Sequence, residues 1–195
     1  MTDSWPHTVL RPRDVIRRLR ARTTAGTTSA SGFTQRVSTN AHIWVIEYDG
    51  ILISTEHELA SWDAVEASLD GAANPIYVPL VGDTDGATPG SLVGATAAGQ
   101  TIVTVRRVGD TVKNGRHFSV GEARLHRIWW IESSAGDDYL CHIRPPLRDA
   151  YPDAVALNFL QPYCKCRLAS DDEMSLTITP GRFATGAVKF LEDPS

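Results

Sequence analysis

Short apolar and β-branched runs alternate with polar turns through most of the second half of the chain. Between Gly99 and Leu168, strand-like runs such as TIVTV, RIWWIE and YLCHI are each interrupted by glycine, aspartate, asparagine or proline. A two-residue period with frequent turn residues is typical of β-strands, not helices. The pattern therefore predicts a mainly β fold.

One segment of the chain has helical periodicity instead. Ser54 or Thr55 can cap a helix near 55–70, two glutamates suit its first turn, and a glycine follows its end. The stripe of Leu59, Trp62, Val65 or Glu66, and Leu69 recurs at three to four residues, so one face of this helix should pack on the core. We expect this to be the only substantial helix, with all other elements short.

These elements predict a fold class and a domain organisation. We expect a mainly β (α+β) fold, a β-sandwich or a split barrel, with one flanking helix and extended loops or arms. The length suits one domain over 1–195. Within it we expect an N-terminal β/helix half at 1–81, a loop at 82–99 and a C-terminal β half at 100–195.

Arginine is concentrated in the segment RPRDVIRRLRAR, residues 11–22. As a helix this segment would have a narrow apolar face, but as a strand it would have one mixed face and one mostly cationic face, and we favour the strand. It could be a solvated edge strand whose charges block unwanted pairing, an oligomer or partner interface, or a nucleic-acid contact. The candidate interface residues are Arg11, Arg13, Arg17, Arg18, Arg20 and Arg22.

Two adjacent tryptophans, Trp129 and Trp130, lie within the strand-like run RIWWIE. Neighbouring residues of a strand point to opposite faces, so we expect one indole in the core and the other outside. Exposed aromatic side chains contribute strongly to binding at interfaces. Both residues are therefore candidates for a subunit contact.

Composition narrows the class of protein. Hydrophobic residues make up 42% of the chain and the net charge is −4, which predicts a folded protein without bulk attraction to nucleic acid. The N-terminus lacks the apolar core of a signal peptide, and no apolar run is long enough to span a membrane. Three cysteines, an odd number, fit a reduced cytoplasmic environment better than a disulfide framework.

Candidate metal ligands are present, but their spacing is poor for a metal site. Cys164 and Cys166 would share one side of a strand, whereas the adjacent Cys141 and His142 would point to opposite sides. We therefore interpret the thiols as buried structural groups and expect no metal and no cofactor. The sequence around Asp83 resembles the start of a calcium loop, but it lacks the later glutamate.

No pattern typical of catalysis stands out. The histidines are scattered, with no serine or cysteine constellation around them, and acidic clusters fall in turn-like segments. Paired carboxylates of a glycosidase remain conceivable, because the fold sets their separation. We expect a protein that is not an enzyme.

Four segments follow one another in the C-terminal half of the chain. They are GRHFSVG (115–121), PPLR (145–148), QPYCKCRL (161–168) and GRFATGAVKFLE (181–192). An N-terminal SGFTQRV (31–37), Trp44 and the Trp62 helix precede them. In this order the chain resembles small tail-tip proteins of long-tailed bacteriophages and gene-transfer-agent-like particles, the distal tail or baseplate ring proteins.

This resemblance implies a structural virion protein with no catalytic residues to carry over. Its expected partners are further copies of itself in a ring, which we expect to be sixfold, with the tail tube protein, the baseplate hub and tail-fibre proteins. DNA would meet it only in transit through the channel. The resemblance places the protein at the virion tail tip, after assembly in the cytoplasm of the host bacterium. The alternatives are a β-rich carbohydrate- or ligand-binding module and a hydrolase.

Overall fold

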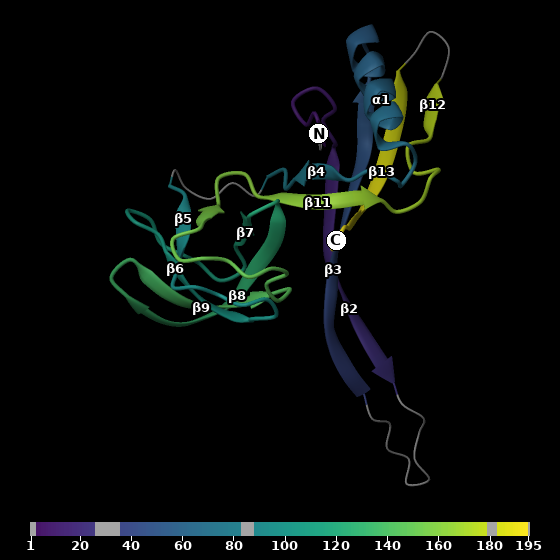
Figure 1. Cartoon of the computed structure of the whole chain (residues 1–195). Coiled ribbons are helices and arrows are strands. Elements are labelled where there is room, and N and C mark those ends of the chain that lie inside the picture. The colour runs from purple at the N-terminus through teal and green to yellow at the C-terminus, as the bar shows by residue number, and fades with distance from the viewer. Residues whose placement is uncertain (1–2, 26–35, 83–87, 179–182, 195) are drawn as a thin grey trace, which may run out of the picture.

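The chain folds into a closed β-barrel joined to an open β-sheet that carries one helix (Figure 1). The computed structural model describes residues 3–25, 36–82, 88–178 and 183–194. Strands account for 49% of the structure and helix for 9%, which confirms the predicted mainly β fold with a single helix.

The open sheet has seven strands in the order β1-β4-β11-β13-β3-β2, with β12 paired to β13. All its pairs are antiparallel except the short β1–β4 pair. Strand β2 forms one edge of this sheet. The strands are β1 Asp3–Ser4, β2 Asp14–Ala25, β3 Arg36–Ile53, β4 Ile76–Pro79, β11 Tyr163–Leu168, β12 Leu176–Ile178 and β13 Ala184–Glu192.

The barrel closes through six strands in the order β10-β5-β6-β9-β8-β7. In β6 the residues alternate as the sequence pattern predicts, because Val103 and Val105 are buried and Ile102 is exposed. The strands are β5 Gly90–Val93, β6 Ile102–Arg106, β7 His117–Val120, β8 Arg124–Ala135, β9 Asp138–Arg144 and β10 Ala156–Asn158.

Two boundaries differ from the sequence prediction. The predicted loop at 82–99 contains β5, whose Leu92 is 1% exposed in the barrel core. The predicted C-terminal half at 100–195 is divided, because β11, β12 and β13 leave the barrel and complete the sheet begun by the N-terminal strands. Pairing between strands that lie far apart in the chain decides both points, and local periodicity does not report it.

Helix α1, Glu56–Leu69, packs on one face of the sheet as predicted. Thr55 caps its N-terminus in a capping box with Glu58. Trp62 is fully buried, and its ring lies so close to Gly186 of β13 that a Cβ there would meet the indole at 2.5 Å. Burial of a large apolar side chain of this kind contributes roughly 1.5–3 kcal/mol.

Strand β3 is the longest of the described elements, with 18 residues, and β2 and β8 have 12 each, so the expectation that every element besides the helix is short is wrong. Strands β2 and β3 form an antiparallel hairpin, which we call the arm. Only residues 45–53 of β3 also pair with β13, so the N-terminal part of β3 pairs with β2 alone. In Figure 1 this part of the arm extends away from both the barrel and the helix. Residues 31–35 of the SGFTQRV segment lie outside the described residues.

A buried ion pair lies where the barrel meets the sheet. Arg148, which follows the barrel strand β9, donates two hydrogen bonds of 3.0 Å to the carboxylate of Glu192 at the end of β13. It also donates to the carbonyl of His42. Glu192 is 5% exposed and accepts the backbone N–H of Trp44 at 2.9 Å. One carboxylate therefore connects the barrel, β13 and β3.

Further contacts at this junction fix the barrel against the sheet. The indole N–H of Trp44 donates to the carbonyl of Leu125 at 2.9 Å, and Arg124 donates to the carbonyl of Asp193 at 2.6 Å. The backbone N–H of Lys165 in β11 donates to Ala123 in the β7–β8 turn at 2.9 Å. The barrel is thereby held beside the base of the arm.

The junction predicts a large asymmetry between single and paired substitutions. Arg148→Ala should destabilise the protein by about 3–5 kcal/mol, because it leaves the Glu192 carboxylate buried without its cation. Burial already raises the pKa of Glu192, although Arg148 opposes that shift. Arg148→Met combined with Glu192→Gln should cost much less, since Gln keeps an acceptor for Trp44. Chemical denaturation of the three proteins measures this, and equal losses in the single and double variants would contradict it.

A second prediction concerns acid stability. Burial lowers the pKa of His126 from 6.5 to about 4, against the opposing effect of its hydrogen bond to the Pro145 carbonyl. The folded state therefore binds fewer protons than the unfolded state between these values. Stability should be fully present above about pH 6.5 and fall by about 3 kcal/mol towards pH 4. His126→Phe should flatten this dependence, whereas His57→Gln on the exposed side of α1 should leave it unchanged.

Candidate interaction surface at the arm and barrel

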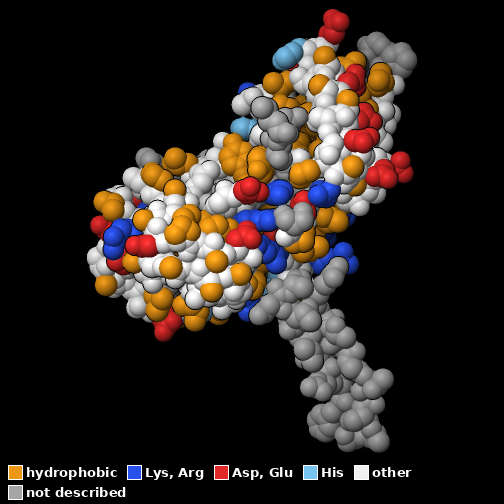
Figure 2. Space-filling model, in the orientation of Figure 1, with side chains coloured by type: hydrophobic (Ala, Val, Ile, Leu, Met, Phe, Trp, Pro, Cys, Tyr) orange, Lys and Arg blue, Asp and Glu red, His pale blue; other side chains and the backbone are white. Residues whose placement is uncertain are grey.

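The arginine-rich segment forms edge strand β2, as the alternation predicts. Val15 and Leu19 pack against the sheet core, and Arg17 shares their face, opposite Ile46 of β3. Arg18 and Arg20 lie on the other face and are exposed. Both faces of the arm thus carry arginine at its base, where Figure 2 shows basic side chains gathered.

The outer face of the arm is a small cationic surface around one carboxylate. Glu47 binds Arg18 and, at 3.0 Å, Lys189 of β13. The hydrogen bond from Lys189 and then that from Arg18 lower the pKa of Glu47, so it remains ionised between two cations. Arg18, Arg20 and Lys189 also line a hollow of about 380 Å³ over this face.

Both neighbouring indoles are outside the barrel, which corrects the expectation that one of them is buried. Trp129 is 44% exposed and Trp130 is 50% exposed. The pairing of β8 with β9 shifts between Ile128 and Trp130, so a bulge at Trp129 interrupts the alternation. Ile128 before the bulge is buried in the barrel core. The run RLHRIWWIESSA (124–135) contains no glycine or proline that would have signalled this bulge.

The two indoles belong to an aromatic and cationic area on the outside of the barrel. Trp129 packs edge-on against His142, with ring centroids 5.4 Å apart, and the guanidinium of Arg144 lies 5.1 Å from its ring centre. Trp130 and Ile102 flank His142 on the neighbouring strands, and Ile102 is 44% exposed. Exposed apolar side chains gathered in this way are typical of contact surfaces.

The structure brings the arm and the indole together in one groove. A cavity of about 440 Å³ separates the base of the arm from the barrel, and we call it the arm–barrel groove. Arg17 and Trp129, predicted independently as interface residues, both line it. The lining residues are Arg17, Trp44, Gly115, His117, Arg127 and Trp129.

Sequence reasoning missed the other four lining residues, Trp44, Gly115, His117 and Arg127. Trp44 is 1% exposed and its ring packs edge-on against His117 at 5.3 Å. His117 pairs directly with Arg127 in the β7–β8 hairpin. The turn between GRHFSV and RLHRI could have suggested that hairpin pair, but only the barrel–sheet junction places it beside the arm.

The remaining candidate arginines lie elsewhere. Arg11 is exposed before β2 and donates to the carbonyl of Thr8 at 2.9 Å. Arg13 packs its stem against Gly50, and its backbone N–H donates to Asp49 at 3.0 Å. Neither residue lines the groove, and the side chain of Arg22 lies outside the described part of the structure.

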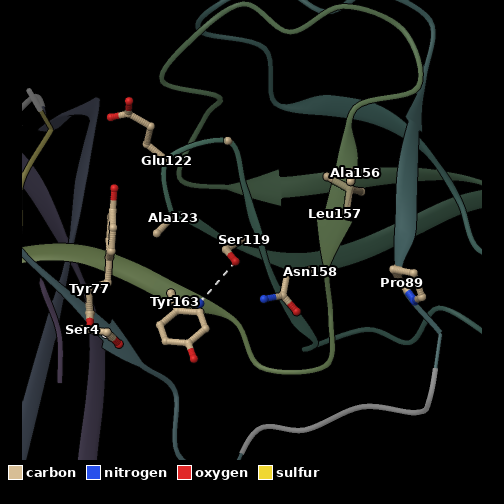
Figure 3. A pocket seen from close by; sticks show the side chains of 11 residues that line it. Ser4, Tyr77, Pro89, Ser119, Glu122, Ala123, Ala156, Leu157, Asn158 and Tyr163 are labelled. Carbon is tan, nitrogen blue, oxygen red and sulfur yellow. Dashed lines mark hydrogen bonds between the residues drawn. The ribbon is translucent and has the colours of Figure 1, made fainter. Parts of the chain in front are cut away.

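A second cavity, of about 600 Å³, lies at the seam between the sheet and strands β7 and β10 of the barrel (Figure 3). Tyr77 of β4 and Tyr163 of β11 border it from the sheet, and Asn158 and Ser119 border it from the barrel. The backbone N–H of Tyr163 donates to the Ser119 hydroxyl at 3.3 Å, which ties the two sides together. Two phenol rings and an amide could contact a small polar ligand.

The candidate metal ligands are not brought together. Cys164 and Cys166 lie in the core of the sheet, whereas Cys141 lies in the core of the barrel. Burial raises the pKa of Cys141 to about 12 and that of Cys164 well above its usual value. Within the described ranges, no group of three or more potential ligand residues could hold a metal ion. Asp83, suggested by the calcium-loop pattern, lies outside the described residues.

Comparison of the chain with protein-family models and with curated protein sequences finds no match. No helix in the described ranges is long and apolar enough to cross a membrane. The interpretation of the groove therefore depends on its own geometry and chemistry.

If the exposed indoles serve a contact and not the fold, their removal should leave stability almost unchanged. Trp130→Ser should alter the free energy of unfolding by no more than about 0.5 kcal/mol, as is usual for surface positions. Trp44→Ala, at a fully buried ring, should cost about 3–5 kcal/mol. Thermal or denaturant unfolding compares them, and a loss of several kcal/mol in Trp130→Ser would assign that indole to the fold.

Proposed function

We propose that this protein is a structural ring subunit at the tail tip of a long-tailed phage or a related particle. Its role is mechanical, not catalytic: it joins the tail tube to the baseplate hub and fibres around a channel for DNA. The observation that supports this most is the arm–barrel groove. There an arginine of an edge strand and an exposed indole, from two separate structural units, line one cavity.

Edge strands and exposed aromatic side chains favour association. An edge strand presents unpaired backbone groups, and a closed ring covers such edges on every subunit without leaving a growing end. Strand β2 is such an edge, and its arginines would keep the pairing selective. A repeated contact of this kind fits the sixfold ring implied by the resemblance to tail-tip proteins.

The barrel and the arm also suit a component that joins different neighbours. The barrel is closed, so its strands have no edge to offer and contacts must use its outer side chains. The arm instead extends beyond the sheet and offers both backbone and arginine side chains. Two surfaces of different character can bind the tail tube on one side and the hub or fibres on another.

A β-rich ligand-binding module remains the second candidate. The seam cavity, with Tyr77 and Tyr163 facing it, favours that function, because phenol rings stack on the apolar faces of sugars. Saturable binding of neutral oligosaccharides by the isolated chain would support the module, whereas the ring subunit requires no such binding.

The test of the proposed function is the position of the protein in purified particles. Antibody labelling or cryo-electron microscopy should find it at the distal end of the tail. Arg17, Arg18 and Arg20 changed together to Glu should leave the subunit folded by circular dichroism and yield particles with defective tails. Arg11→Glu, which precedes β2, is the control and should assemble normally. Location in the capsid, or absence from particles, would contradict the proposal.

A further inference from the structure

The C-terminal half of helix α1 carries acidic side chains and no basic ones. Asp63 and Glu66 are exposed on its surface, Asp70 forms its C-cap, and its last turn has no basic residue. Asp171 extends this acidic surface, since its carboxylate accepts the backbone N–H of Ala72 at 2.9 Å. We call this surface, with Asp172, the acidic end of α1.

This arrangement is unfavourable for the helix in isolation. The C-terminus of a helix carries partial negative charge, which cations stabilise and carboxylates do not. In the described part of the chain, no ion pair involves Asp63, Glu66 or Asp70. A cationic partner docked here would relieve the repulsion among these groups.

The acidic end and the arm are separated along the strand order of the sheet. Asp171 follows β11, and the loop after α1 leads into β4, the neighbour of β11. Strands β13 and β3 separate β11 from β2. Figure 2 shows red side chains on the lobe that contains α1 and blue ones where the arm begins. One subunit therefore presents complementary charges on two separate surfaces.

We propose that the acidic end of α1 of one copy of this chain docks in the arm–barrel groove of the next copy. The carboxylates of Asp63 and Glu66 meet the guanidinium groups of Arg17 and Arg127, and the indole of Trp129 covers the helix end. Because the two surfaces differ, the contact is head-to-tail and generates a ring or an open filament. This inference rests on the proposed ring and names its subunit interface.

The groove suits this occupant better than a duplex of nucleic acid. The groove has a volume of about 440 Å³ and is lined by two arginines and by aromatic side chains. Side chains from one end of a helix can enter a cavity of this size. The outer cationic face of the arm already has a carboxylate of its own, because Glu47 contacts both Arg18 and Lys189. The contact is electrostatic at its edges, so salt should weaken it.

Disulfide trapping tests the contact even when it is weak. Asn114→Cys borders the groove beside Gly115, and Ala67→Cys lies on the exposed side of α1. Mixed and mildly oxidised, these two proteins should form a mixed dimer about tenfold faster than either homodimer, and about 1 M salt should abolish the excess. The native cysteines are buried and do not compete. Asn114→Cys with Ser134→Cys, at the far end of β8, is the matched control.

Charge reversal then tests the chemistry of the contact. Arg17→Glu with Arg127→Glu should abolish trapping, as should Asp63→Arg with Glu66→Arg. Combining the groove reversal on the Asn114→Cys chain with the helix reversal on the Ala67→Cys chain should restore it. Arg11→Glu and Asp137→Arg, single reversals elsewhere, should leave trapping unchanged.

The following results of these experiments would overturn the inference. Trapping equal to the control pair, or no restoration in the doubly reversed mixture, removes α1 as the occupant. Binding of a labelled DNA duplex that the groove reversal abolishes, without trapping, assigns the groove to nucleic acid. If particles carry the protein at the tail tip but trapping fails, the proposed function stands and this interface is wrong.

Discussion

The buried pairing of Arg148 with Glu192 is the interaction on which the arrangement of this molecule depends. Barrel and sheet each have their own apolar core, and Leu125 of the barrel strand β8 packs into the core of the sheet. A bidentate pair with little access to water is directional, because its attraction offsets desolvation only in one geometry. Since Glu192 also accepts the N–H of Trp44, that geometry fixes the barrel against the strand from which the arm extends.

The groove is a consequence of this placement. Trp44 reaches across the junction, with its indole N–H bound to the barrel and its ring against His117. The wall formed by the barrel and the wall formed by the arm would otherwise be unrelated surfaces. The buried polar junction thus holds the two walls of the groove in one relative position, as a rigid scaffold holds a binding loop.

Local patterns in the sequence predicted the parts of the fold that are locally determined. The cap at Thr55, the stripe containing Trp62 and the alternation of β2 follow from propensities and periods within a few residues. The return of β11 to β13 to the first sheet and the length of β3 depend on pairing with strands that are distant in sequence. Nothing near Leu92 indicates that GSLV closes a barrel, because four residues are too few for a period.

The candidate site shows the same division. Arg17 and Trp129 could be chosen from charge and aromatic character alone, whereas Trp44, His117 and Arg127 belong to the site only through the junction.

The bulge at Trp129 explains why simple alternation gave the wrong environment for one indole. A strand that kept strict alternation would have placed either Trp129 or Trp130 in the barrel core. By exposing both, β8 loses no core volume, since Ile128 fills that position, and it presents an aromatic surface next to the arm. A bulge that turns apolar side chains toward water is costly for an isolated subunit, and in the proposed ring a neighbouring copy would offset that cost by covering them.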